Sequence, residues 1–399
     1  MNRKNIPKLR FKSFDNEWEQ EILSNKATVI MGQSPDSQNY TNNPNDYVLV
    51  QGNADLKDKK VFPRVWTTQV TKTAESGDII LSVRAPVGDV GITKFPVVIG
   101  RGVAAIKGNN YIYHLLDKLN ISGFWNKYST GSTFESISSN DIKNAIVNFP
   151  SLPEQSAIGT LFQTLDELLS AYKDNLANYQ AFKATMLSKM FPKAGQTTPE
   201  IRLDGFDGEW EEKKLKNLST HRGGTAIEKF FDEKGIYKVI SIGSYGVDNK
   251  YFDQNIRAIS NEVTDSRIVH KGELTMVLND KTSNGTIIGR CLHIEHEGVF
   301  VVNQRTEIIS PSSEFDSFFA YVSLNGPFRE KVKKIVQGGT QIYVNYSSVE
   351  ELTLFVPTLT EQRAIGAFFA NLDDLIASQQ TKIAELETLK KKLLQEMFV

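Results

Sequence analysis

At 399 residues the chain exceeds the usual size of one hydrophobic core, so two or more domains are expected. A hydrophobic content of 40% excludes a disordered chain, and no apolar run suits a membrane span or a signal peptide. The single cysteine, Cys291, excludes a disulfide framework and indicates a reducing cytoplasm, while a formal net charge of −1 lacks the basic excess of a stand-alone nucleic-acid binder.

The first element along the chain is a lead-in segment that recurs later. Residues 9–19 read LRFKSFDNEWE and residues 201–211 read IRLDGFDGEWE, with six of eleven positions identical at an offset of 192. Residues 150–191 align without a gap with residues 357–398 at an offset of 207, with sixteen of forty-two positions identical. The larger offset leaves the second middle fifteen residues longer. We therefore predict a two-fold internal repeat with similar ends and diverged middles, since simple duplication followed by drift would not obviously spare the ends.

The two middles share a pattern of short strands between Gly, Asn and Pro clusters. The expected strands are 78–83 and 89–93 in the first middle and 273–278 and 286–292 in the second. Each middle later has a G-x-T turn, Gly131-Ser132-Thr133 and Gly338-Gly339-Thr340, again at an offset of 207. A helical piece over 315–336 makes the expected fold of each unit mixed α/β.

Each unit is followed by a long helix. Ser151 with Glu154, and Thr358 with Glu361, match the capping box, in which hydroxyl and carboxylate bind free amides at a helix start. From Glu154 the first helix is expected to run 38 residues to Phe191, a rod of roughly 57 Å at ~1.5 Å per residue, before Pro192 ends it.

The apolar positions of both helices fall on a heptad, which predicts a seam that needs a partner helix. The seam residues singled out are Phe162, Leu165, Leu169 and Leu176 in the first helix and Phe369, Leu372, Ile376 and Ile383 in the second. The order unit, helix, unit, helix favours an antiparallel coiled coil. Lys183 and Lys390 interrupt the same seam position, where each either fixes register or extends its ammonium to water. The acidic pairs Asp166-Glu167 and Asp373-Asp374 are expected on the solvent side.

The predicted architecture is thus two mixed α/β units separated by two long helices, with a pseudo-two-fold repeat. The expected parts are a first recognition unit at 1–150, a first spacer helix at 151–192, a polar linker at 193–200, a second recognition unit at 201–357 and a second spacer helix at 358–399.

Catalytic motifs are missing from the sequence. It contains no Walker A segment, no G-x-G-x-x-G after a strand, no nucleophile elbow and no Asn/Asp-Pro-Pro segment of an amino-methyltransferase. Cys291, His293 and Glu295 would share one face of a strand, yet a zinc deaminase needs a further P-C-x-x-C. An edge strand facing water explains them better, so neither an enzyme nor a metal site is expected.

The P-x-L-x-E-Q-x-A-I-G helix entry, the F-D-G-E-W-E-like lead-in and the two divergent middles resemble the specificity subunits of type I restriction–modification systems over essentially the whole chain. The resemblance implies that each middle is a target recognition domain reading one half of an asymmetric, interrupted double-stranded DNA site. It implies that the helices dock two adenine methyltransferase subunits, which bind S-adenosylmethionine, and that motor and nuclease subunits using ATP and magnesium join them. The chain itself is expected to hold no cofactor.

Base reading uses Arg or Lys on guanine and Asn or Gln on adenine, which selects candidate readers near strand ends. The first-unit candidates are Lys57, Lys59, Lys60, Arg64, Arg84, Arg101, Ser132 and Thr133. The second-unit candidates are Lys250, Arg257, Asn279, Lys281, Arg290, Arg305, Gln341 and Tyr343. Arg101 aligns with Arg305, and the turn holding Arg84 aligns loosely with that of Lys281. A solvent-exposed surface cation is the competing interpretation for each of them.

Two other functions stay open at this point. The repeated helices would also suit a scaffold that assembles proteins without touching DNA, and dispersed carboxylates could belong to a self-sufficient nuclease. The net charge of −1 adds the hypothesis that partner subunits supply many of the phosphate contacts.

Overall fold

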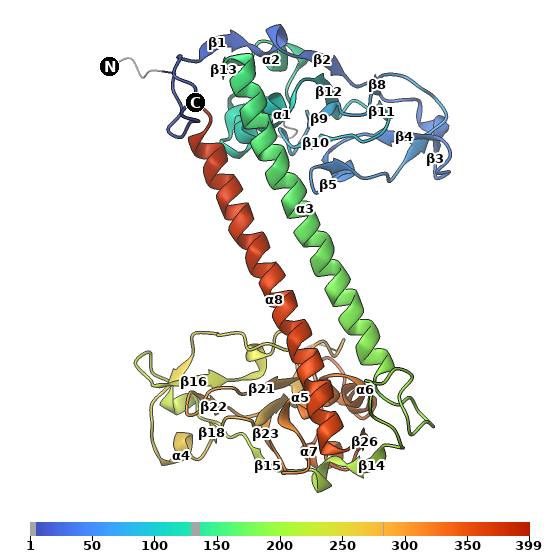
Figure 1. Ribbon diagram of the computed structural model, residues 1–399, viewed down its shortest axis with the longest axis vertical. Helices are drawn as coiled ribbons and strands as arrows, with labels where there is room; N and C mark the ends of the chain where they lie inside the picture. Colours follow the sequence, from blue (N-terminus) through green and yellow to red (C-terminus); the bar gives the residue numbers. More distant parts are fainter. Residues whose placement is uncertain (1–4, 129–135, 282) are drawn as a thin grey trace. The chain divides into compact units, whose positions relative to one another are not determined.

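The computed structural model describes residues 5–128, 136–281 and 283–399, and its contacts divide the chain into two units. Unit 1 combines the first 173 residues with Thr381–Val399, and unit 2 is Asp174–Gln380 (Figure 1). Both boundaries fall inside long helices, because α3 spans Leu152–Lys189 and α8 spans Leu359–Glu396. Each unit therefore takes one half of each helix.

The described part of unit 1 contains two larger sheets and a strand pair. The first sheet has the order β2-β12-β9-β10-β6-β5, the second β3-β7-β4-β11-β8, and β1 pairs with β13. The strands are β1 Glu19–Ile22, β2 Thr28–Met31, β3 Tyr40–Thr41, β4 Tyr47–Val50, β5 Leu56–Lys57, β6 Lys60–Val61, β7 Trp66–Thr67, β8 Thr73–Ala74, β9 Ile79–Ser82, β10 Val90–Ile92, β11 Val97–Ile99, β12 Val103–Lys107 and β13 Ile146–Phe149. Its complete short helices are α1 Asn110–Ile121 and α2 Ser139–Lys143.

Unit 2 repeats this plan. Its sheets have the orders β15-β23-β19-β21, β17-β16-β22-β18 and β20-β25-β24, and β14 pairs with β26. The strands are β14 Glu211–Lys214, β15 Ser219–Gly223, β16 Tyr237–Ile240, β17 Arg257–Ala258, β18 Ile268–Val269, β19 Leu274–Val277, β20 Asn279–Asp280, β21 Cys291–His293, β22 Phe300–Val302, β23 Thr306–Pro311, β24 Gln337–Gly338, β25 Ile342–Tyr343 and β26 Thr353–Val356. Its short helices are α4 Glu262–Asp265, α5 Ser317–Asn325, α6 Pro327–Lys334 and α7 Tyr346–Val349.

These elements confirm the mixed α/β repeat and correct some of its details. The helix predicted over 315–336 is two helices, because Gly326 and Pro327 end one and begin the next. The strand predicted over 286–292 begins only at Cys291, after a turn that contains the left-handed Gly289. The G-x-T turn at residues 338–340 joins β24 to β25, whereas its counterpart at residues 131–133 lies outside the described residues.

The two copies of the lead-in and of the helix end meet in equivalent aromatic clusters. In unit 1, Phe398 stacks on Tyr111 with ring centroids 5.3 Å apart, and Trp18 lies edge-on to both rings. In unit 2, Phe191 stacks on Phe319 at 5.8 Å, and Trp210 lies edge-on to both. Each core is thus closed by the C-terminal end of the helix that follows the other recognition unit in sequence.

Each long helix begins with a buried glutamate that binds an arginine of the lead-in. Arg10 donates from Nε and Nη2 to the two carboxylate oxygens of Glu154, at 2.6 and 2.7 Å. Arg202 and Glu361 make the same paired contact at 2.8 and 2.7 Å. The expected role of these carboxylates as amide caps is therefore wrong, because a buried carboxylate is better neutralised by a two-pronged guanidinium. The helices start at Leu152 and Leu359, directly after the predicted capping residues Ser151 and Thr358.

The predicted seam residues lie mainly in the cores. Phe162, Leu165 and Leu169 are buried in unit 1 and Phe369 and Leu372 in unit 2. Of the remaining predicted positions, Ile376 is buried, whereas Leu176 and Ile383 are half-buried.

Ion pairs join the two helices within each unit. The interrupting lysines bind aspartates of the opposite helix, Lys390 with Asp166 in unit 1 and Lys183 with Asp373 in unit 2. The prediction that these aspartates face solvent is wrong, because a half-buried ammonium at the seam needs a nearby negative charge.

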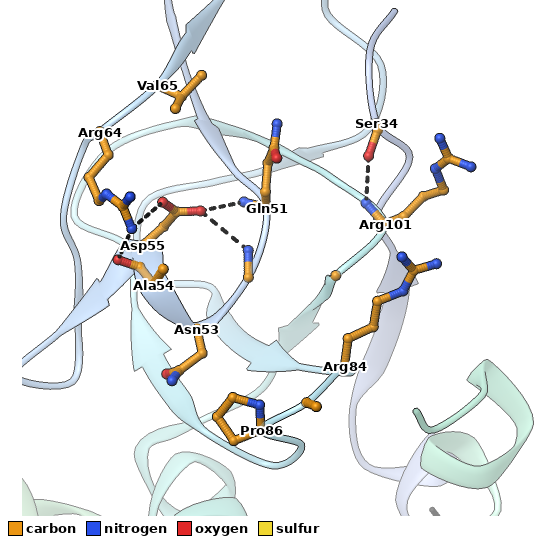
Figure 2. A pocket seen from close by; sticks show the side chains of 13 residues that line it. Ser34, Gln51, Asn53, Ala54, Asp55, Arg64, Val65, Arg84, Pro86 and Arg101 are labelled. Atoms are coloured by element: carbon orange, nitrogen blue, oxygen red, sulfur yellow. Dashed lines mark hydrogen bonds and ion pairs between the residues drawn. The ribbon is translucent and has the colours of Figure 1, made fainter. Parts of the chain in front are cut away.

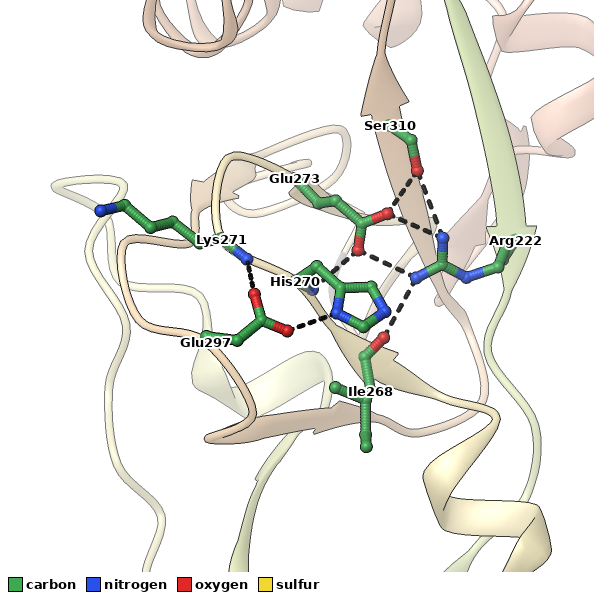
Figure 3. Close-up of polar contacts among 7 residues, drawn as sticks. All are labelled: Arg222, Ile268, His270, Lys271, Glu273, Glu297 and Ser310. Carbon is green, nitrogen blue, oxygen red and sulfur yellow. Dashed lines mark hydrogen bonds and ion pairs between the residues drawn. The ribbon is translucent and has the colours of Figure 1, made fainter.

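A buried acid anchors the strand after Gly77 in unit 1 and after Gly272 in unit 2. Lys107 neutralises Asp78 at 3.0 Å, whereas both oxygens of Glu273 accept from Arg222, at 2.7 and 2.9 Å (Figure 3). Burial raises the pKa of Glu273, but Arg222 and the other donors outweigh burial and leave that pKa below its usual value. The buried carboxylate at this position is thus neutralised from a different strand in each unit, by Lys107 of β12 and by Arg222 of β15.

Candidate nucleic-acid interface

Three of the predicted reader arginines of unit 1 line one hollow. Arg64, Arg84 and Arg101 share a cavity of about 600 Å³ with the backbone that follows β4 (Figure 2). Arg101 lies in the turn between β11 and β12, Arg84 follows β9, and Arg64 precedes β7. Loops at the ends of neighbouring strands thus bring together side chains that are 37 residues apart in sequence.

Close backbone approach shapes this hollow. A side chain on Gly102 would overlap the carbonyl oxygen of Gln51, and one on Gly32 would overlap that of Gly100. Asp55, at the end of the 3-10 turn Asn53–Asp55, is buried and accepts the N–H groups of Gln51 and Gly52 at 2.7 and 3.3 Å. These hydrogen bonds to the buried Asp55 fix the 3-10 turn that faces the arginines.

The charge of the hollow is positive. Arg64 donates to the carbonyl oxygen of Ala54 at 3.0 Å and lies 3.9 Å from Asp55. The guanidinium groups of Arg84 and Arg101 are exposed and make no hydrogen bond or ion pair with the described residues. Free guanidinium groups suit either phosphate oxygens or the O6 and N7 acceptors of guanine.

The lysines predicted beside these arginines are placed differently. Asp58 and Lys59 form the left-handed turn between β5 and β6. Lys59 binds the buried Asp117 of α1, and Lys60 donates to Ser170 of α3 at 3.2 Å. Lys57 lies 5.3 Å from the centre of the Phe62 ring. Lys59 and Lys60 therefore connect the β5–β6 hairpin to α1 and α3, and none of the three lysines lines the hollow. Ser132 and Thr133 lie outside the described residues.

In unit 2 the predicted readers gather at β20 and β25. Asn279 pairs with Tyr343 across the two strands, and its amide oxygen accepts from Arg305 at 2.8 Å. Lys281 follows β20 and Gln341 precedes β25, and both are exposed. Asn279 thus brings Tyr343 and Arg305 together, whereas Lys281 and Gln341 lie only next to the two strands in sequence.

Other predicted readers of unit 2 take part in internal contacts. Arg257 binds both carboxylate oxygens of Asp253 at 2.9 Å, and this pairing holds the pKa of Asp253 well below its usual range. Arg290 donates to the side chain of Asn249 and to the carbonyl oxygen of Thr286. Lys250 is exposed on the same hairpin as Asn249. Arg257 and Arg290 therefore support the fold around the candidate site.

Sequence reasoning missed a pair of exposed phenylalanines at equivalent places. The N–H of Phe62 donates to the carbonyl oxygen of Asp55, and the N–H of Phe252 donates to that of Ser244, both at 2.8 Å. Their side chains are 49% and 62% exposed. The sequences around them share no motif, so only the common hydrogen bond identifies the pair.

The described residues offer no metal-binding cluster and no membrane-spanning helix. No cluster of His, Cys, Asp and Glu side chains there is arranged to hold a metal ion. None of the helices described has the length and apolar character to cross a membrane.

Comparison with known proteins places these features in context. The chain matches the type I restriction modification DNA specificity domain twice, over residues 16–204 and 207–388. A putative MjaX specificity subunit from Methanocaldococcus jannaschii is 32% identical over 178 residues. The matched region is 42% of this chain and 40% of that protein. The MjaVIII specificity subunit from the same organism is 22% identical over 71% of this chain and 68% of its own length.

A solved structure has the same fold. The type I restriction–modification S subunit from M. genitalium superposes with a TM-score of 0.67 over 99% of both chains, at 16% identity.

Proposed function

Because the chain belongs to the type I restriction modification DNA specificity family, we propose that it is the non-catalytic specificity subunit of a restriction–modification complex. The observation that carries this proposal is the duplicated family domain, with strand-end loops that present Arg side chains in the first copy and Arg, Asn and Gln side chains in the second. Side chains of this kind read base edges in the major groove.

The proposed target is double-stranded DNA with a bipartite, asymmetric site. Each recognition unit reads one half-site, and the diverged middles imply that the two half-sites differ. This proposal is supported by the differences between the equivalent strand-end loops, such as Arg64, Arg84 and Arg101 on one side and Asn279 and Arg305 on the other.

The helices α3 and α8 are proposed to form an antiparallel coiled coil that docks two adenine methyltransferase subunits. Within unit 1, Asp166 binds Lys390 and Lys173 binds Glu387, so positions that rise along α3 meet positions that fall along α8. The repetition of the helix sequence supports two copies of one partner, because equal surfaces recognise equal proteins.

In this proposal the chemistry belongs to the partners in the cytoplasm. S-adenosylmethionine binds the methyltransferase subunits, while ATP and magnesium serve the motor and nuclease subunits. The net charge of −1 agrees with partners that supply many phosphate contacts. Tight, salt-sensitive DNA binding by the purified chain alone would argue against that division of labour.

The test is to express the chain with its adenine methyltransferase and to map methylated adenines by long-read sequencing. We expect one bipartite, non-palindromic motif, and we expect Arg84→Ala to relax one half-site only. A complex that forms but methylates no motif would favour a scaffold. Cleavage of plasmid DNA by the purified chain with magnesium would instead reveal a nuclease.

A further inference from the structure

Three pairs of positions at the strand ends are equivalent in the two units. For the first pair, β4 runs parallel to β11 and β16 runs parallel to β22. The N–H of Gly100 then donates to the carbonyl oxygen of Val50 at 2.7 Å, and that of Asn303 to Ile240 at 2.9 Å. The residue that follows each donor is Arg101 in unit 1 and Gln304 in unit 2, and both are exposed. The first position is therefore arginine in unit 1 and glutamine in unit 2. The alignment of Arg101 with Arg305 made from sequence is wrong by one residue, because Val83 donates its N–H to the carbonyl oxygen of Gly102 as Leu278 donates its N–H to that of Arg305.

The second pair was not apparent from sequence. After β4 the side chain of Asp55 accepts the N–H of Gln51 at 2.7 Å, and after β16 the side chain of Ser244 accepts the N–H of Ser241 at 3.1 Å. Phe62 and Phe252 bind the carbonyl oxygens of Asp55 and Ser244, as described above. Arg64 lies two residues after Phe62, and Gln254 lies two residues after Phe252.

Each of these two side chains contacts the 3-10 turn of its own unit, Asn53–Asp55 in unit 1 and Ile242–Ser244 in unit 2. Arg64 donates to the carbonyl oxygen of Ala54 at 3.0 Å. Gln254 accepts from the hydroxyl of Ser241 at 2.7 Å and lies against the backbone of Gly243. The second position is thus arginine in unit 1 and glutamine in unit 2.

The third pair corrects an alignment made from sequence. Arg84 bridges to Ser136, and Asn279 pairs with Tyr343, which lies 207 residues after Ser136. Arg84 is therefore equivalent to Asn279, and its loose alignment with Lys281 is wrong by two residues. The third position is arginine in unit 1 and asparagine in unit 2.

We propose that these three positions determine which bases each unit accepts. In the first half-site Arg64 and Arg84 read guanine, and at the equivalent places of the second half-site Gln254 and Asn279 read adenine. This inference rests on the proposed function and adds the base class to it. Arginine presents two donors that fit O6 and N7 of guanine, whereas a side-chain amide presents one donor and one acceptor that fit N7 and N6 of adenine. At the first position Arg101 and Gln304 differ in the same sense.

Asn279 remains able to read a base while it is held in place. Asn279 donates once to the carbonyl oxygen of Leu278 and accepts once from Arg305. An amide has two N–H bonds and two lone pairs, so one of each stays available. Fixing the side chain through the other pair lowers the entropy lost on binding.

The experiment exchanges the second position between the units. Arg64→Gln and Gln254→Arg are made in the full chain, assembled with the methyltransferase, and the methylated motif is mapped. We expect Arg64→Gln to replace or relax one guanine of the first half-site, with about a ten- to hundred-fold change in relative methylation of guanine- and adenine-containing sites. Gln254→Arg is expected to do the converse in the second half-site.

The unaltered half-site of each variant is its matched control. Arg64→Lys separates reading from charge, because lysine keeps the charge but lacks the fork that contacts two acceptors. We expect this variant to discriminate poorly at the same base pair. An unchanged motif in both exchange variants, or methylation reduced equally at all sites, would overturn the inference while the wild-type motif still supports the proposed function. Absence of any motif with the wild-type chain would instead reject the proposed function.

Discussion

Single side chains in equivalent places of the two units have different physical tasks, and His114 of α1 is one example. Its ring is buried against Phe162, and its Nε2 lies 4.0 Å from Asp166. Burial, reinforced by Lys390 and Lys59, lowers the pKa of His114 to about 3. The equivalent residue of unit 2 is Val322, because Tyr111 and Phe319 hold matching places three residues earlier.

This burial predicts acid sensitivity in unit 1. An unfolded histidine titrates near pH 6.5, so the folded unit binds fewer protons between that pH and about 3. Stability is therefore present above pH 6.5 and falls as the pH drops, by up to about 1.4 kcal/mol per pH unit. His114→Val should flatten the pH dependence of the stability of unit 1 between pH 6.5 and 5. This range lies above the one in which most carboxylates titrate.

Urea unfolding monitored by tryptophan fluorescence checks this prediction. A Trp210→Phe background leaves Trp18, Trp66 and Trp125, which all belong to unit 1. Equal pH slopes with and without His114 would show that other groups cause the dependence.

At the scale of elements, charge pairs add orientation to an apolar seam between helices. Lys390 and Asp166 are 12% and 31% exposed, whereas Lys173 and Glu387 on the same two helices are 45% and 52% exposed. Ion pairs that keep their full hydration contribute little, because water screens the charges. The half-buried pair should therefore carry most of the electrostatic coupling between α3 and α8 in unit 1.

Double-mutant cycles measure that difference. With Lys390→Met and Asp166→Asn, we expect a coupling free energy of about 1–2 kcal/mol in urea unfolding. The exposed pair, tested with Lys173→Met and Glu387→Gln, should give less than about 0.5 kcal/mol. Equal coupling energies for both pairs would contradict the role given to burial.

At the scale of the whole molecule, the chain closes each unit with a segment distant in sequence. The N–H of Leu9 donates to the carbonyl oxygen of Glu396, and that of Ile201 to Lys189, both at 2.9 Å. The segment before β1 is therefore bonded to the end of α8 in unit 1. In the same way, the segment before β14 is bonded to the end of α3 in unit 2. Folding of unit 1 therefore requires residues 381–399, which follow unit 2 in sequence.

Phe398→Ala tests this dependence. Removing a buried phenylalanine costs about 3–5 kcal/mol through lost burial and the cavity left behind. We expect a loss of that size in unit 1 alone, and an equal loss in unit 2 from the matched change Phe191→Ala. Hydrogen exchange resolved by segment distinguishes the units, and protection lost throughout the chain in either variant would exclude independent cores.

Sequence by itself determined the repeat, the mixed α/β units and the long helices, because apolar periodicity and internal similarity can be read directly along the chain. It also selected Arg64, Arg84 and Arg101, since arginines at strand ends are natural readers of bases. Only the tertiary structure decided that these three share one hollow, whereas Lys59, Arg257 and Arg290 make internal contacts. It also paired Arg64 with Gln254, through hydrogen bonds to turns that share no sequence motif. The physical reason is that charge pairing and strand register depend on distances between segments remote in the chain.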